Sequence, residues 1–363
     1  NKLKLRTYQL ECLEAIKEGF ARGVTKQQVV MATATGKTAV LASIKSFLEL
    51  KKKTLFLVHR EEIIKQTLKQ FNTWNSSEIV EIEQASNYAS NDATTILASM
   101  QTLGRKNSER ILRFNKEEFD LIILDESNRS VCQSYINILR HFGILKGEEN
   151  RQTPCLLVGF TATPNRTDAI ALNNVFDEII FNYPIYDSTK PSGITDGYLV
   201  DIKGIRISSD VGLDHIPTIA GDLAQGELQK TVNISKRNNL IVDSWTKYGE
   251  NRPTIAFCSG VEHAKALAYS FTTKGIHAEA VWGDDPLKSN KLDSFRKGKT
   301  NIITSVNILV EGVNYPNASC GLFCRPTKSS LVFVQSAGRL LRLPEGAENL
   351  QDAINKGLKR DAI

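Results

Sequence analysis

Short apolar runs alternate with segments of helical periodicity along the first part of the chain. The runs occupy residues 28–30, 54–60, 94–102, 119–124 and 156–160. They lack polar alternation, which predicts strands that are buried on both faces. Strands of this kind, separated by helical segments, predict a doubly wound parallel sheet. Such a sheet binds its ligand at the carboxyl ends of its strands.

The same rhythm returns after a polar stretch. Residues 184–200 are rich in Pro, Gly, Ser, Asp and Thr, which predicts a domain boundary near Leu199. Apolar runs follow at 254–258, 278–282, 301–305 and 321–325, with helical patterns at 222–233, 237–245, 287–295 and from Glu262 onward. The sequence therefore predicts two α/β domains, 1–200 and 201–345, each a mostly parallel sheet flanked by helices. Residues 346–363 remain as a tail.

One predicted strand runs into a turn that could bind phosphate. Residues 28–30 are followed by Met31-Ala32-Thr33-Ala34-Thr35-Gly36-Lys37-Thr38 and then by a helical segment, 39–48. Backbone N–H groups at a helix N-terminus attract anions. Lys37 would reach the β- and γ-phosphates, and the Thr38 hydroxyl would hold Mg²⁺. The strict pattern has Gly where Met31 stands, so the alternative is an ordinary surface turn.

Two adjacent carboxylates end the apolar run 119–124. Asp125 and Glu126 would be costly at the end of a buried strand unless they were paired or bound to metal. Asp125 could hold Mg²⁺, and Glu126 could orient or deprotonate an attacking water. The alternative is a strand that simply ends in acidic turn residues. The preceding Gly-Lys-Thr turn favours the metal site.

Other polar side chains have two interpretations each. Gln9 lies in a helical pattern over 5–20, where its amide suits an adenine edge or a plain helix surface. Gln101 and Thr102, at the end of a predicted strand, suit phosphate contacts or an ordinary strand end. Thr161 and Thr163, after another strand, could sense the carboxylates or mark a simple turn.

A basic pair follows near the end of the second domain. Arg339 and Arg342 are three residues apart, so a helix would place them on one face, near Gln335. Two guanidinium groups and an amide suit a triphosphate presented by another domain. The alternative is a basic helix face in solvent.

Composition narrows the class of protein. Hydrophobic residues make up 41% and charged residues 24% of the 363 residues, as in ordinary globular proteins. The net charge of +6 permits a polyanionic partner without requiring one. No two of the six cysteines form a Cys-x-x-Cys pair, which argues against a zinc site. No apolar run reaches the ~20 residues that a membrane span needs.

In chain order, these motifs resemble those of the superfamily-two helicases and translocases of the DEAD/H-box type. The ordered set is Gln9, Gly36-Lys37-Thr38, Asp125-Glu126, Thr161-Ala162-Thr163-Pro164, Glu311-Gly312, and Gln335 with Gly338-Arg339 and Arg342. More closely, the chain is similar to the fungal mitochondrial type that handles branched DNA. That likeness rests on Val58-His59-Arg60, Ser134-Tyr135, Gly226-Glu227-Leu228, residues 293–298 and residues 325–329. The resemblance covers residues 5–345.

The resemblance implies two RecA-like domains that close on ATP and open after hydrolysis, stepping along a nucleic-acid backbone. It implies nucleotide contacts for Gln9, Ala34, Thr35, Gly36, Lys37 and Thr38, and Mg²⁺ ligation for Thr38 and Asp125. It assigns the attacking water to Glu126, the nucleotide-facing side of the second domain to Gln335 and Arg339, and an arginine finger to Arg342. It assigns coupling to nucleic acid to Arg60, Gln101, Thr102, Thr161, Thr163, Thr304 and Glu311.

The chain departs from the family pattern at several positions. Ala34 stands where the family's loop usually has Gly, and its methyl group would crowd the backbone approach to phosphate or strain the turn. The usual Asp-Glu-Ala-His is Asp125-Glu126-Ser127-Asn128 here, and Asn314 replaces an Asp. Groups for phosphate and metal chemistry therefore remain, whereas groups that couple hydrolysis to movement have changed.

These observations favour a DNA-dependent ATPase that uses ATP and Mg²⁺ to move on or remodel double-stranded or branched DNA. The expected protein is a monomer without a membrane segment, with a mitochondrial location implied by the resemblance alone. One alternative is a degenerate core that binds nucleotide and nucleic acid without efficient hydrolysis. Another is an RNA remodeller, since these motifs contact phosphates and carry little base or sugar information. The family usually has a further C-terminal region, which the tail would begin.

Overall fold

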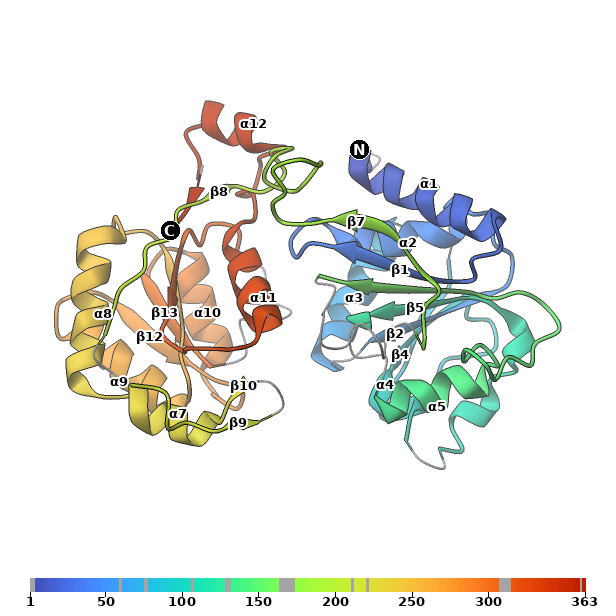
Figure 1. Ribbon diagram of the computed structural model, residues 1–363, viewed down its shortest axis with the longest axis horizontal. Helices are drawn as coiled ribbons and strands as arrows, with labels where there is room; N and C mark the ends of the chain where they lie inside the picture. Colours follow the sequence, from blue (N-terminus) through green and yellow to red (C-terminus); the bar gives the residue numbers. More distant parts are fainter. Residues whose placement is uncertain are drawn as a thin grey trace. The chain divides into compact units, whose positions relative to one another are not determined.

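The computed structural model describes residues 4–58, 61–74, 78–105, 108–127, 132–162, 174–209, 212–219, 222–306, 315–359 and 361–363. The chain divides into two compact units, Asn1–Pro184 and Ile185–Ile363, coloured blue to green and green to red in Figure 1. Residues 185–200, which the sequence analysis assigned to the first domain, thus belong to the second compact unit.

A seven-stranded parallel sheet forms the first unit. Its order is β3 (Val80–Glu83), β4 (Thr95–Ser99), β2 (Lys53–Val58), β5 (Phe119–Asp125), β6 (Leu156–Thr161), β1 (Lys26–Met31) and β7 (Glu178–Tyr183). The five predicted strands are confirmed, and their side chains are almost all buried. The two outer strands were not predicted because most of their residues are partly or fully exposed, so they lack an apolar run.

Helices cover both faces of this sheet (Figure 1). One group consists of α1 (Thr7–Ala21), α2 (Lys37–Phe47) and α3 (Glu61–Trp74), in which α2 packs against both of the others. A second group is α4 (Met100–Leu103) packed against α5 (Gln133–His141). The short 3₁₀ helices η1 (Ile111–Arg113) and η2 (Lys116–Glu118) precede β5. The strand predicted over 94–102 is too long. It ends at Ser99, because Met100 and Leu103 are one helical turn apart and both bury their side chains.

A four-stranded parallel sheet forms the second unit. Its order is β12 (Ala278–Val281), β13 (Ile302–Ser305), β11 (Thr254–Phe257) and β14 (Cys320–Phe323). Its described helices include α7 (Gln225–Val232), α8 (Ser235–Tyr248), α9 (Val261–Thr272), α10 (Lys288–Arg296) and α11 (Ser330–Leu340). Trp245 of α8 meets Phe271 of α9 edge to face in its core, with ring centroids 5.7 Å apart. The predicted α/β class is therefore confirmed for both units.

Two segments of the second unit differ from the predictions. The helix expected over 222–233 begins at Gln225, because Asp222–Leu223 is a strand, β10, that pairs with β9 (Thr218–Ile219). The tail is folded rather than separate. It contains α12 (Leu350–Asn355) and β15 (Asp361–Ala362), which pairs in parallel with β8 (Asp201–Ile202).

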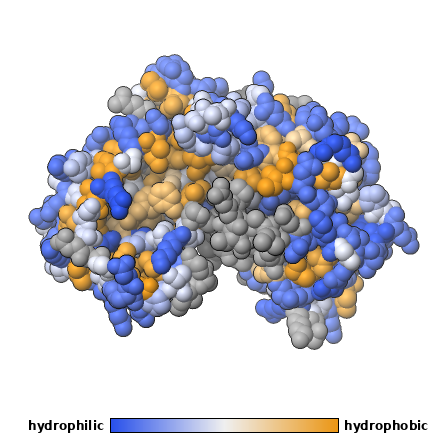
Figure 2. Space-filling model, viewed as in Figure 1, coloured by the Kyte–Doolittle hydropathy of each residue, from blue (hydrophilic) through white to orange (hydrophobic). Residues whose placement is uncertain are grey.

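An apolar cavity of about 580 Å³ lies in the second unit, lined by residues 202–207 and by side chains of α8, β14 and α11. Trp245, Phe323 and Leu340 are among its lining residues. Figure 2 shows hydrophobic surface among the hydrophilic residues of this unit, on the left of the view. Within the part of the chain that the structure describes, no helix combines the length and the apolar character that a membrane span requires.

Candidate nucleotide-binding site

The register of the first sheet brings the predicted site residues of three strands to one edge. Val30 of β1 pairs with Thr161 of β6, and Phe160 of β6 pairs with Asp125 of β5. All three strands run parallel, so their carboxyl ends lie side by side. The loop 32–36 follows β1 at this edge and leads into α2. Thr161 is fully buried, while Asp125 is partly exposed.

The loop 32–36 contains two residues in the left-handed conformation. Ala34 has φ 73° and Gly36 has φ 76°. Gly36 is the N-cap of α2, and a Cβ atom there would lie 2.8 Å from Nε2 of Gln9. The Thr35 hydroxyl donates to the Ala32 carbonyl at 2.6 Å, which closes the turn. The strain expected at Ala34 is confirmed, because an alanine adopts this φ only at a cost.

Two residues in the first turn of α1 donate hydrogen bonds to the same loop. The Tyr8 hydroxyl donates to the Thr35 carbonyl at 2.6 Å, and Tyr8 stacks on Tyr183 with ring centroids 4.2 Å apart. The Gln9 amide nitrogen donates to the carbonyls of Thr35 and Gly36 at 3.2 and 3.3 Å. Its oxygen accepts from the Arg6 N–H at 2.8 Å. Gln9 thus fixes the loop, and an adenine contact stays a prediction.

Lys37 lies beside the acidic pair. Its Nζ is 3.8 Å from Oε1 of Glu126, and both side chains are largely shielded from solvent. The Glu126 N–H donates to Oδ1 of Asp125 at 3.1 Å. Glu126 has φ 54°, a conformation rare for a residue with a long side chain and found disproportionately at functional sites. Sequence motifs that are far apart in the chain therefore form one cluster of charges.

This cluster fits Mg²⁺ and a nucleotide phosphate by its chemistry. A cation on the first turn of α2, the N-terminus of that helix and the Thr38 hydroxyl suit phosphate oxygens and the metal. Asp125 supplies the hard oxygen ligand that Mg²⁺ prefers, with water and phosphate completing the shell. When bound, the metal ion would supply charge stabilisation at the phosphate.

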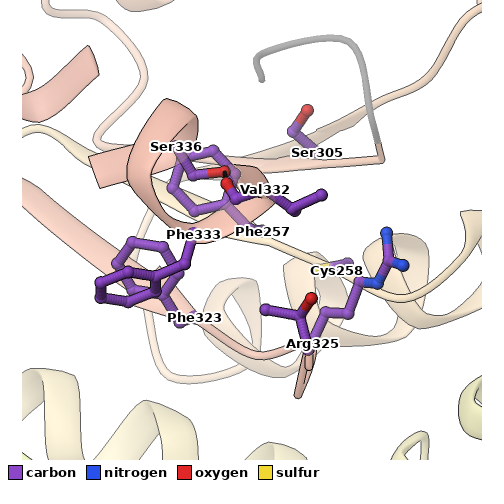
Figure 3. A pocket seen from close by; sticks show the side chains of 9 residues that line it. Phe257, Cys258, Ser305, Phe323, Arg325, Val332, Phe333 and Ser336 are labelled. Carbon is purple, nitrogen blue, oxygen red and sulfur yellow. Dashed lines mark hydrogen bonds between the residues drawn. The ribbon is translucent and has the colours of Figure 1, made fainter. Parts of the chain in front are cut away.

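In the second unit, the predicted residues Gln335 and Arg339 lie on α11. Gln335 and Ser336 are buried, and Arg339 is partly exposed. A small pocket of about 20 Å³ opens where α11 meets the carboxyl ends of β11, β13 and β14. Figure 3 shows Ser336 and Val332 on one side of it, with Phe323 and Phe333 in tilted contact at the edge. This pocket holds about one water molecule, so it is too small for a nucleotide.

Arg342 and Thr304 differ from their sequence-based description. Arg342 does not share a helical face with Arg339, because α11 ends at Leu340 and Arg342 forms an antiparallel bridge with Leu199. Burial and the nearby Arg339 guanidinium lower the pKa of Arg342. Thr304 is fully buried inside β13, and its hydroxyl donates to the Ala264 carbonyl at 2.8 Å. Its side chain is therefore part of the core.

Some of the remaining predicted residues lie outside the described part of the chain. Arg60, Thr163 and Glu311 lie outside the described residues, as do the divergent Asn128 and Asn314. Gln101 and Thr102 lie on α4; Gln101 is exposed, and its Oε1 accepts from the Ser99 hydroxyl at 2.8 Å.

Sequence reasoning missed two tyrosines of this site. Tyr8 carries the shortest contact to the loop, and Tyr183 supports it from β7. The only signal for Tyr8 was its place beside Gln9 in the first helical turn. Tyr183 is the last residue of β7, a strand that the sequence pattern did not indicate.

Comparison with known proteins gives the same two-part organisation. Residues 2–166 match the family described as type III restriction enzyme, res subunit, and residues 235–344 match the helicase conserved C-terminal domain. The chain is 32% identical over 353 residues to the mitochondrial ATP-dependent helicase irc3 of Schizosaccharomyces pombe, covering 95% of this chain and 56% of that protein. It is 29% identical to the ATP-dependent helicase IRC3 of Saccharomyces cerevisiae, covering 93% and 49%. The chain thus spans about half the length of these relatives.

The fold agrees with a solved structure. The ATP-dependent type ISP restriction-modification enzyme LlaBIII, solved bound to DNA, matches with a TM-score of 0.67 at 19% identity, over 95% of this chain and 27% of that one. That likeness concerns the fold alone. The two RecA-like parallel sheets coincide with the two matches: the restriction-enzyme subunit family on the first unit and the helicase C-terminal domain on the second. Over most of its length the chain is similar to ATP-dependent helicases, and its fold is that of the superfamily-two helicases.

Proposed function

We propose that this chain is the motor core of an ATP-dependent DNA helicase or translocase, which hydrolyses ATP to move on or remodel double-stranded or branched DNA. The observation that carries the proposal is the cluster of Lys37, Asp125 and Glu126. Lys37 Nζ lies 3.8 Å from Glu126, which follows Asp125 at the end of β5. These residues supply a phosphate-binding cation, a metal ligand and a base for water at one sheet edge.

Each residue has a distinct task in this proposal. Lys37 and the α2 N-terminus would hold phosphate oxygens, and Thr38 with Asp125 would hold Mg²⁺. A phosphate on Lys37 would release the Glu126 carboxylate, which then orients the attacking water. From the second unit, Gln335, Arg339 and Arg342 would face the nucleotide, with Arg342 stabilising charge on the transferred phosphate.

DNA and a mitochondrial location belong to the same proposal. LlaBIII, similar in fold, was solved with DNA, and the S. pombe relative is named a mitochondrial helicase. The net charge of +6 is compatible with phosphate contacts along a nucleic acid. Stronger stimulation of ATP hydrolysis by RNA than by DNA would instead identify an RNA remodeller.

A second candidate is a core that binds nucleotide without efficient hydrolysis. The left-handed Ala34 favours it, because its methyl group occupies a loop whose backbone must approach phosphate closely. The intact cluster of Lys37, Asp125 and Glu126 opposes it.

The experiment that tests the proposal is ATP hydrolysis with and without branched duplex DNA, beside the Lys37→Ala variant. We expect hydrolysis that rises with DNA and falls at least about a hundredfold in the variant, since the phosphate cation is lost. Hydrolysis that persists in Lys37→Ala would reject this site. Nucleotide binding without hydrolysis in the wild type would instead support the binding module.

The arginine-finger assignment has its own prediction. Arg342→Ala should lower turnover by about a hundredfold or more while nucleotide affinity changes little, because the guanidinium acts on charge that develops during transfer. Turnover and the affinity for a fluorescent ATP analogue would be measured together. An equal loss of both would contradict the assignment.

A further inference from the structure

The end of α11, which leads to Arg342, is held by a residue of the folded tail. The last carbonyls of a helix lack partners within it. The Leu340 carbonyl accepts a hydrogen bond from Nζ of Lys359, and the Leu341 carbonyl accepts from the Val200 N–H at 2.9 Å. Arg342 itself bridges Leu199. The backbone around Arg342 is therefore held by residues 199–200 and by Lys359.

Lys359 joins this helix end to a second segment. Its ammonium also donates to the carbonyls of Ala318, at 2.6 Å, and Pro316, at 3.2 Å, in the turn before β14. Three carbonyl acceptors match the three donors of an ammonium group. A cation at this position also complements the negative end of the α11 dipole.

The neighbourhood of Lys359 is positive. Burial and the charges of Arg342 and Arg252 lower the pKa of Lys359 to about 7. Arg252 is paired in turn with Asp361 and Glu250. An ammonium next to two guanidinium groups is unfavourable in itself, so the three carbonyls and the helix dipole must offset that repulsion.

The tail holds the backbone of Lys359 in place. β15 pairs with β8, and Lys203 forms an ion pair with Asp361 at 2.8 Å. Beyond β15, the Ile363 N–H donates to the Ser319 carbonyl at 2.9 Å, and its carbonyl accepts from the Gly321 N–H at 2.7 Å. Lys359 lies two residues before this paired strand.

We propose that Lys359, which lies beyond the matched helicase C-terminal domain, is a positioning residue for Arg342: its ammonium links the end of α11 to the turn before β14 and so sets where the Arg342 guanidinium lies. This inference rests on the proposed function in taking Arg342 as a residue of ATP hydrolysis. Under this proposal, the tail, residues 346–363, contributes to ATP hydrolysis.

The test compares Lys359→Met, Lys359→Arg and the matched control Lys356→Met. Lys356 lies in the same tail, where it is exposed and pairs with Asp352 at 2.8 Å. We expect Lys359→Met to lower kcat about tenfold with little change in KM for ATP, because only transition-state contacts through Arg342 are affected. Lys359→Arg should restore most of kcat, and Lys356→Met should behave as wild type.

A double-mutant cycle separates positioning from general stability. If Lys359 acts through Arg342, adding Lys359→Met to Arg342→Ala should lower kcat no further. Independent, multiplicative losses would overturn the proposal, as would wild-type kcat in folded Lys359→Met. Lys359→Gln replaces the methionine variant should the latter fail to fold.

A readout without hydrolysis distinguishes this inference from the proposed function. Amide hydrogen exchange at residues 338–343 should accelerate in Lys359→Met and stay unchanged in Lys356→Met. A wild-type chain that does not hydrolyse ATP would reject the proposed function, while the exchange data would still decide whether Lys359 holds this segment. Unchanged exchange in Lys359→Met would overturn the positioning role.

Discussion

At the residue scale, backbone strain is concentrated where the proposed chemistry lies. Ala34 and Glu126 both have positive φ, at 73° and 54°, and both lie at the carboxyl edge of the first sheet. Each conformation costs about 1–2 kcal/mol for a residue with a side chain. The surrounding contacts, above all those to Thr35 and Gly36 from α1, must hold the loop against this cost.

Exchanging alanine and glycine in the loop should shift stability in opposite directions. Ala34→Gly relieves the left-handed strain, partly offset by unfolded-chain entropy, and should raise the free energy of unfolding by about 0.5 kcal/mol. Gly36→Ala introduces strain and a Cβ 2.8 Å from Gln9, and should lower it by about 1–2 kcal/mol. Urea unfolding of both variants checks this. A destabilised Ala34→Gly would mean that the methyl group makes favourable contacts in the loop.

At the scale of elements, α1 acts as a clamp on the loop between β1 and α2. Tyr8 reaches Thr35 with its hydroxyl and lies flat on Tyr183, while the Ala32 N–H donates to the Tyr183 carbonyl at 2.9 Å. Helix α1, the loop and β7 are thereby fixed together. Sequence periodicity identified α1 but not this link, because the link depends on β7 lying beside β1.

Removing the Tyr8 hydroxyl tests the clamp. Tyr8→Phe keeps the stacking on Tyr183 but leaves the buried Thr35 carbonyl with one hydrogen bond fewer, at a cost of about 1 kcal/mol. We expect a lower melting temperature and a severalfold weaker affinity for ATP. Tyr186→Phe, at an exposed tyrosine, is the control. ATP affinity equal to wild type in Tyr8→Phe would show that the loop does not need this contact.

At the scale of the whole molecule, each unit has its own sheet and core, so each can respond separately to conditions. His263 is fully buried on α9 of the second unit, where its Nδ1 accepts from the Ser259 hydroxyl at 2.9 Å. Burial and the Arg237 charge lower the pKa of His263 to about 4. The unfolded chain, with an ordinary histidine pKa near 6.5, therefore binds more protons than the folded one between these values.

Acid should accordingly destabilise the second unit through His263. Its stability contribution is present above pH 6.5 and is lost as pH falls toward 4, by roughly 3 kcal/mol in all. Hydrogen exchange of second-unit amides at several pH values would measure this slope. His263→Asn, which does not titrate, should flatten it, whereas His277→Asn at an exposed histidine should not. An unchanged slope in His263→Asn would assign the acid sensitivity to other groups.

The class of fold and the core strands of both sheets could be predicted from the amino-acid sequence alone, and so could the candidate residues of the site. Strands that are buried on both faces appear in the sequence as short apolar runs, because neither face tolerates polar residues. A Gly-Lys-Thr turn is likewise a local sequence motif. The half-exposed strands β3 and β7 show no such apolar run. The tertiary structure was needed to place Lys37 beside Glu126, Tyr8 on Tyr183 and Lys359 at the end of α11. These contacts join residues far apart in the chain, so their geometry depends on how the elements pack.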